Sequence, residues 1–215
     1  TIADPSGALS AAVVSVNVIP STIYWDGEAG DNLWENPINW STNELPGRHD
    51  HVLISVESAD PIIVVGSGDH WVIDLNSDED IEIRGGSLSI QRNSQIGADL
   101  TMSGGTLGGE ADISVSDLFS WTAGTLTGSG SLVAASGMVI DGAGTKTLSE
   151  DRRLENRGTG NWLGGDVLSS MATWIRRWPR RRRSLMFISM PSASISPAPP
   201  ATRRPATMWR AAVIR

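Results

Sequence analysis

A short glycine-containing motif recurs along the chain at a nearly constant interval, and this repeat constrains the fold more than any other feature. Three close copies are RGGSL at 84–88, SGGTL at 103–107 and TAGTL at 122–126. Their third residues are glycines 19 residues apart, and two looser copies extend the series at spacings of 20 and 21 residues. The glycines of this series are Gly86, Gly105, Gly124, Gly144 and Gly165.

A period of about 20 residues indicates stacked units, each too small to bury its own apolar face. Because the units are rich in strand-forming residues, we predict an all-β chain that forms a right-handed parallel β-helix, a solenoid with about 19–21 residues per turn. We expect the repeated glycine to form a tight corner with positive φ. The leucine two residues later is expected to point inward and stack on its equivalents, which are Leu88, Leu107 and Leu126.

Short β-branched runs precede the repeats and support an all-β fold for this part of the chain. They lie at 52–56, 62–65, 71–75 and 81–83, each bounded by Gly, Asn, Asp or Pro. We therefore predict four segments. They are a lead-in strand at 1–22, a Trp-rich β cap at 23–77, parallel β-helix repeats at 78–168 and an Arg/Pro-rich disordered tail at 169–215.

The predicted cap carries motifs of a known class of proteins. They are WDG at 25–27, Trp34, NW at 39–40 and PGRHDHVLI at 46–54. This stretch resembles the N-terminal module of large bacterial secreted proteins, which leads into autotransporter-passenger-like or haemagglutinin-like parallel β-helix repeats. The resemblance implies a secreted or cell-surface location, and surface polysaccharide or other cell-surface components as partners.

Three tryptophans of the cap have two interpretations. Trp25, Trp34 and Trp40 either stack on sugar rings or close the first open turn of the solenoid. The cap interpretation is favoured, because large aromatic side chains supply much of the core energy of small modules.

Metal binding is considered at three places. His49 and His51 share a strand face and, with His70, form one candidate for a metal site. The acid runs 26–31 and 78–80, the latter with Asn76 and Glu82, offer oxygen ligands for Ca²⁺. The run at 78–80 lacks the EF-hand spacing, and exposed turn acids explain both runs adequately. We therefore expect no cofactor, with calcium as the alternative, and assign neither a metal-binding nor a catalytic residue.

Composition excludes several classes of protein. The chain has no cysteine, so disulfides, Cys-ligated metals and thiol nucleophiles are absent. No apolar run approaches the ~20 residues of a membrane-spanning helix. The chain begins at Thr1 without a basic leader, so we expect no signal peptide within this sequence.

The net charge of −7 combines two unlike parts. Residues 1–170 hold all 24 acids and all 23 glycines, whereas residues 171–215 hold ten arginines and no acid. An out-of-frame translation of a GC-rich gene, a disordered tail and a polyanion-binding arm all fit the latter segment, and we favour the first. Nucleic acid is therefore not expected as a partner.

The function expected from these features is structural or adhesive: a passive β-helical stalk of a secreted bacterial cell-surface protein, and not an enzyme. The alternative is a carbohydrate-active enzyme or polysaccharide-binding module built on a β-helix. Polyanion binding through the basic tail ranks third.

Overall fold

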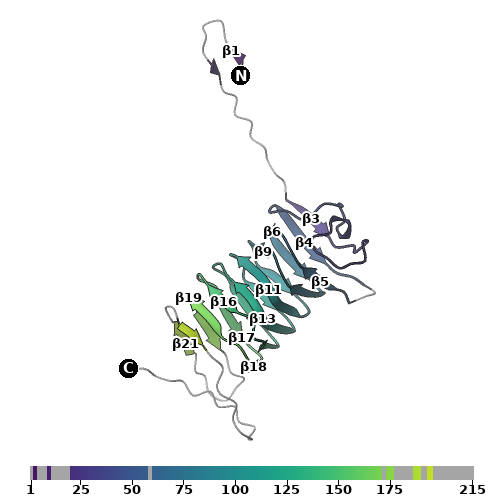
Figure 1. The fold of residues 1–215 in the computed structure, drawn as a ribbon. Helices are drawn as coiled ribbons and strands as arrows, with labels where there is room; N and C mark the ends of the chain where they lie inside the picture. Colours follow the sequence, from purple (N-terminus) through teal and green to yellow (C-terminus); the bar gives the residue numbers. More distant parts are fainter. Residues whose placement is uncertain are drawn as a thin grey trace.

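The computed structural model describes residues 20–57 and 60–170, together with the backbone of short strands outside these ranges. The described chain is built from strands and contains one 3-10 helix, η1 (Pro37–Asn39) (Figure 1). The predicted lead-in segment at 1–22 and the predicted tail at 169–215 fall largely outside the described residues. The frameshift and polyanion-arm interpretations of the tail concern those residues as well.

The strands follow one another in a regular order along the chain. They are β1 Ile2–Ala3, β2 Leu9–Ser10, β3 Ser21–Tyr24, β4 Asp50–Ile54, β5 Ile62–Val65, β6 Asp69–Val72, β7 Asp74–Ser77, β8 Asp80–Ile83, β9 Ser87–Ile90, β10 Ser94–Ile96, β11 Leu100–Gly109, β12 Ile113–Val115, β13 Leu118–Leu126, β14 Ser131–Ala134, β15 Gly137–Ile140, β16 Lys146–Ser149, β17 Arg153–Asn156, β18 Thr159–Trp162, β19 Val167–Ser170, β20 Thr173–Arg176, β21 Met186–Ser189 and β22 Ala193–Ile195.

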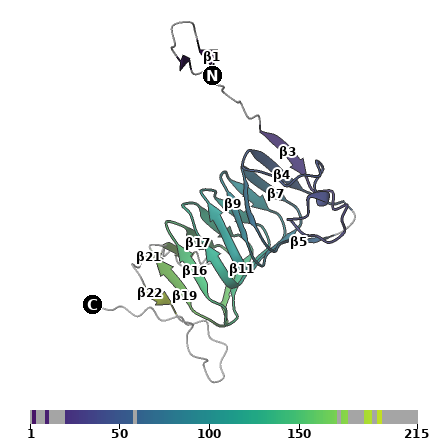
Figure 2. The ribbon, with the colours of Figure 1, turned by 45° about the horizontal axis from the view of Figure 1, so that its top comes forward.

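Strands β3 to β20 wind into a parallel β-solenoid of about six turns, so the predicted all-β parallel β-helix is confirmed (Figure 2). One face is a sheet with the order β21-β20-β17-β14-β12-β10-β7-β4-β3. A second sheet, with the order β22-β19-β16-β13-β11-β8-β5, bends around a corner to form the other two faces and includes β6, β9, β15 and β18. From β3 to β20, the strands of successive coils pair in parallel.

The predicted cap and the predicted repeats belong to the same sheets. β4 pairs with β7, and β5 pairs with β8, both in parallel, so the solenoid already includes strands before residue 78. The predicted boundary between residues 77 and 78 therefore marks a change in sequence pattern only, because strands on both sides of it pair in the same sheets.

The inward face of each coil carries an apolar side chain that stacks on the coils above and below. Leu88 lies opposite Leu107, Leu107 opposite Leu126, and Leu126 opposite Leu148, each almost fully buried. This column lies on the face of the second sheet that follows the glycine corner. Burial of each leucine contributes on the order of 2 kcal/mol relative to an exposed position.

The repeated glycines lie where the second sheet turns from one face to the next. Gly86, Gly105, Gly124 and Gly165 have φ between +59° and +98°. At Gly105 an added Cβ would lie 2.7 Å from the carbonyl oxygen of Gly85 in the preceding coil. These corners therefore need glycine for two reasons, the left-handed backbone and the close approach of neighbouring coils.

Gly144 differs from the other four glycines, because positive φ in its coil is found at Gly142. The register explains the difference: Gly124 pairs with Lys146, so this corner contains extra residues. Paired residues are 19 apart from Ile96 to Val115 but 22 apart from Leu132 to Leu154. The alignment of repeats from sequence, with a spacing of 20 residues here, therefore assigns the positive-φ corner to Gly144 instead of Gly142.

Candidate functional site

The three cap tryptophans form a buried cluster. The rings of Trp25 and Trp34 both pack edge-on against Trp40, with centroids 4.9 Å and 4.7 Å away. Trp34 and Trp40 are fully buried and Trp25 nearly so, and the indole N–H of Trp40 donates to the carbonyl oxygen of Trp34 at 2.8 Å. No ring face in this cluster is open to a sugar, which favours the cap interpretation.

The loop that carries this cluster is held by a carboxylate. Asp31 accepts hydrogen bonds from the side chains of Asn36 and Asn39, each at 2.7 Å, and from the backbone N–H of Leu33 at 3.1 Å. These bonds, that of Asn36 first, lower the pKa of Asp31 below its ordinary value. Asp31, part of the acid run considered for calcium, thus has a structural role in the loop.

The three histidines lie in different surroundings and do not converge on one point. The Nδ1 atom of His51 lies 2.7 Å from a carboxylate oxygen of Asp74, while the Nε2 atom of His70 is 2.9 Å from the carbonyl oxygen of Ser67. His49 is exposed in the loop before β4. Among the residues that the structure describes, no group of three or more His, Cys, Asp or Glu side chains is arranged to hold a metal ion.

The acid run at 78–80 is also engaged with the main chain. Glu79 is buried, and its carboxylate accepts a hydrogen bond from the backbone N–H of Val56 at 2.7 Å. The carboxylate of Asp80 accepts one from the N–H of Asp99 at 2.9 Å. Both side chains join one coil to another.

Two cations are buried inside the solenoid at corners. The guanidinium of Arg152 donates to the carbonyl oxygens of Gly109, Ala111 and Thr127 at 2.8–2.9 Å, and so spans successive coils. Burial lowers the pKa of Arg152 to about 10, opposed by nearby carboxylates. The ammonium of Lys146 donates to two carbonyl oxygens of its own corner, and burial lowers its pKa as well. All these acceptors are main-chain carbonyls, so both cations brace the backbone.

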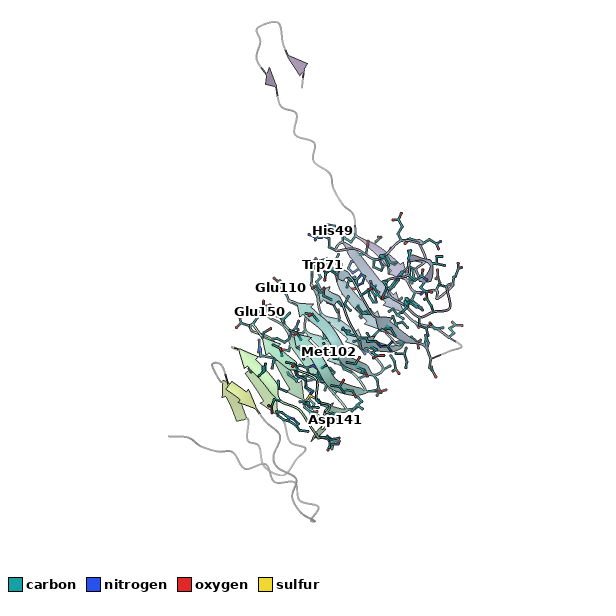
Figure 3. All side chains as sticks on the ribbon, in the orientation of Figure 1. His49, Trp71, Met102, Glu110, Asp141 and Glu150 are labelled. Carbon is teal, nitrogen blue, oxygen red and sulfur yellow. The ribbon has the colours of Figure 1, made fainter. Side chains whose placement is uncertain are left out.

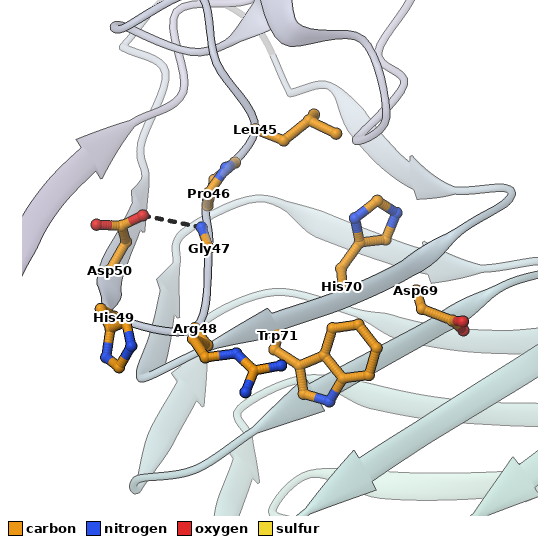
Figure 4. A pocket seen from close by; sticks show the side chains of 9 residues that line it. All are labelled: Leu45, Pro46, Gly47, Arg48, His49, Asp50, Asp69, His70 and Trp71. Atoms are coloured by element: carbon orange, nitrogen blue, oxygen red, sulfur yellow. Dashed lines mark hydrogen bonds between the residues drawn. The ribbon is translucent and has the colours of Figure 1, made fainter. Parts of the chain in front are cut away.

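A pocket of about 490 Å³ lies on the outside of the solenoid near its N-terminal end (Figure 4). The loop 45–50 forms one wall and residues 69–71 of β6 form the other. The loop is fixed because the carboxylate of Asp50 accepts hydrogen bonds from the backbone N–H of Gly47 at 2.8 Å and from the hydroxyl of Ser21 at 2.5 Å.

Trp71 is the large side chain of this pocket, and the residue is 40% exposed. The guanidinium carbon of Arg48 lies 5.7 Å from the centre of the Trp71 ring, within the range of a cation–π contact. Asp69, also on the outward face of β6, accepts a hydrogen bond from the hydroxyl of Ser87 at 2.6 Å. Figure 3 places Trp71 near His49 on one side of the solenoid.

Sequence reasoning singled out Trp25, Trp34 and Trp40 and missed Trp71. The signal was the alternation in Asp69–Val72, where Val72 faces the core and Trp71 therefore faces outward. In a strand with alternating buried and exposed residues, an aromatic residue at an exposed position is the pattern that would have identified this surface.

Comparison with family models, with curated proteins and with solved structures gives no match for the chain. The part of the chain that the structure describes contains no helix long and apolar enough to cross a membrane.

Proposed function

We propose that this chain is a structural segment of a secreted bacterial cell-surface protein, in which the solenoid serves as a stiff, passive stalk. The observation that supports the proposal is the continuous parallel pairing of successive coils from β3 to β20. Buried side chains fill the interior along its length, so each coil is supported by both neighbours.

Side chains add axial connections to this pairing. Asp80, Asp99 and Asp112 each accept a hydrogen bond from a backbone N–H one coil further along the chain. Arg152 adds three bonds between coils at a corner. Side-chain hydrogen bonds that join neighbouring coils make local unfolding of a single coil less favourable, and a stalk requires this resistance.

The experiment that tests this proposal combines proteolysis with an activity assay. Proteinase K digestion of the full chain, followed by mass spectrometry, is expected to leave a resistant fragment that includes β4 to β19. Incubation with neutral and acidic polysaccharides is expected to release no new reducing ends. Rapid cleavage within the coils, or turnover of any polysaccharide, would contradict a passive stalk. Antibodies against the coils are expected to label intact cells of the source organism.

A further inference from the structure

We propose that the pocket beside Trp71 is a binding site for a neutral polysaccharide. The surface that carries this proposal, here named the Trp71 platform, consists of Arg48, Asp69 and Trp71. It lies outside the solenoid core and does not contribute to the coil-to-coil support described above. The proposal therefore stands or fails separately from the stalk proposal.

The first argument is the exposure of the indole. Trp25, Trp34, Trp40 and Trp121 are buried, whereas Trp71 is 40% exposed. Leaving a large aromatic surface in water forgoes the stabilisation that its burial would give. Trp71 is therefore available for an apolar partner from outside, and it lies in a pocket whose volume falls in the range of small-molecule sites.

The second argument is the chemistry around the ring. Arg48 forms no ion pair with a carboxylate among the described residues, so its guanidinium, which lies over one face of the Trp71 ring, keeps its N–H donors available. Only one oxygen of Asp69 accepts a hydrogen bond from Ser87, which leaves the other oxygen as an acceptor. The ring face that Arg48 does not cover, with these donors and this acceptor beside it, matches a pyranose ring, which has an apolar C–H face and a rim of hydroxyl groups.

The third argument concerns the charge of the ligand. Residues 1–170 hold 24 acids against seven bases. Such a surface repels polyanions, and Figure 3 shows Glu110 and Glu150 on the same side of the solenoid as Trp71. The single cation of the platform is therefore assigned to hydroxyl groups of a neutral glycan, and an acidic glycan is the ligand that the surroundings disfavour.

Titration calorimetry of the full chain tests the assignment with five probes, namely cellohexaose, xylohexaose, mannohexaose, maltohexaose and hexa-N-acetylchitohexaose, with hexagalacturonate as the acidic comparison. We expect at least one neutral probe to bind with a Kd of about 1 mM or tighter. Trp71→Ala is expected to weaken that binding roughly tenfold or more, and Trp71→Phe to recover part of the loss. Arg48→Ala is expected to weaken it by a smaller factor.

Ile62→Ala is the matched control, because Ile62 is another exposed apolar side chain on a strand of the same sheet, outside the pocket. Its binding is expected to equal that of the unchanged chain. Thermal melting of Trp71→Ala within about 2 °C of the unchanged chain shows that any lost binding is not lost folding. The proposal is overturned if no neutral probe binds, if Trp71→Ala binds as well as the unchanged chain, or if only hexagalacturonate binds.

Discussion

The carboxylate of Asp99 accepts a hydrogen bond of 2.8 Å from the backbone N–H of Leu118, 19 residues later and one coil further along the solenoid. The backbone N–H of Asp99 in turn donates to the carboxylate of Asp80 in the preceding coil. The same relationship recurs at a second corner. There the backbone N–H of Asp112 donates to the side-chain oxygen of Asn93, and the backbone N–H of Ser131 donates to the carboxylate of Asp112. Asp and Asn side chains thus form two axial ladders beside the sheets.

Loss of one ladder carboxylate is expected to destabilise the solenoid. Asp99→Ala removes the acceptor of the Leu118 N–H and is expected to lower the free energy of unfolding by about 1–2 kcal/mol. Asp99→Asn keeps an acceptor oxygen and is expected to cost less. Urea denaturation measures both, with the exposed Asp117→Ala as a control that leaves stability nearly unchanged. Equal effects of Asp99→Ala and Asp117→Ala would contradict the ladder.

Substitutions at three glycines test separately the two reasons why a position needs glycine, namely a left-handed backbone and close contact with a neighbouring coil. Gly30 has φ +70° but no atom near an added Cβ, so Gly30→Ala tests backbone strain alone and is expected to cost about 1 kcal/mol. Gly104 lacks positive φ, but an added Cβ would clash with the carbonyl oxygen of Arg84. Gly105 combines both features. Melting temperatures are expected to fall least for Gly30→Ala and most for Gly105→Ala, and the reverse order would refute this account.

The two innermost tryptophans are expected to respond differently to phenylalanine. Trp40→Phe loses the hydrogen bond to the carbonyl oxygen of Trp34, whereas Trp34→Phe removes an N–H for which the described residues offer no partner. Trp40→Phe is therefore expected to be the less stable variant by about 1 kcal/mol in chemical denaturation. Trp34→Ala is expected to lower Tm strongly, and an unchanged Tm would argue against the cap interpretation.

Arg152 is expected to be among the most sensitive polar positions. Arg152→Met removes three hydrogen bonds to main-chain carbonyl oxygens of other coils, at a cost on the order of 3 kcal/mol. The neighbouring Arg153 is exposed, so Arg153→Met is the control and is expected to stay within about 0.5 kcal/mol of the unchanged chain. Hydrogen exchange should locate the loosened amides near residues 109–127. Similar losses for both variants would contradict the bracing role.

Acid is expected to destabilise the protein partly through Glu82. Its carboxylate accepts hydrogen bonds from Arg84 and from Ser103 of the next coil, and these bonds lower the pKa of Glu82 in the folded state. The unfolded chain then binds the proton more readily, so this contribution is present above about pH 5 and is lost as the pH falls toward 3. Glu82→Gln should flatten the fall of Tm over that range, whereas Glu110→Gln, at an exposed position, should not. An unchanged slope in Glu82→Gln would contradict the assignment.

The repeat was sufficient to predict the fold because it records the main-chain geometry directly. A glycine is needed wherever the second sheet turns a corner, so the spacing of Gly86, Gly105 and Gly124 reports the length of each coil. The prediction failed in detail at Gly144, where extra residues in the corner shift the register and place Lys146 opposite Gly124.

The candidate site was harder to predict from sequence because it depends on side-chain direction. Tryptophans looked alike in the sequence, yet Trp34 faces the core and Trp71 faces solvent. The bracing role of Arg152 depends on carbonyls 25 to 43 residues earlier in the chain, which only the stacking of coils brings within reach. Neither property has a local motif.

The change from 19 to 22 residues between paired positions has a consequence for how such a protein can grow. The additional residues are accommodated at the corner near 141–145, while β13, β16 and β19 stay in register. A coil can thus gain residues at a corner while its strands stay paired with those of its neighbours. The complete coil is therefore the unit that can be copied. Tandem duplication of residues 94–112 would place a second Ser94–Ile96 segment opposite the first and lengthen the rod by one strand spacing, ~4.8 Å. Length is therefore a property that this architecture can change by duplication, without redesign of any interface.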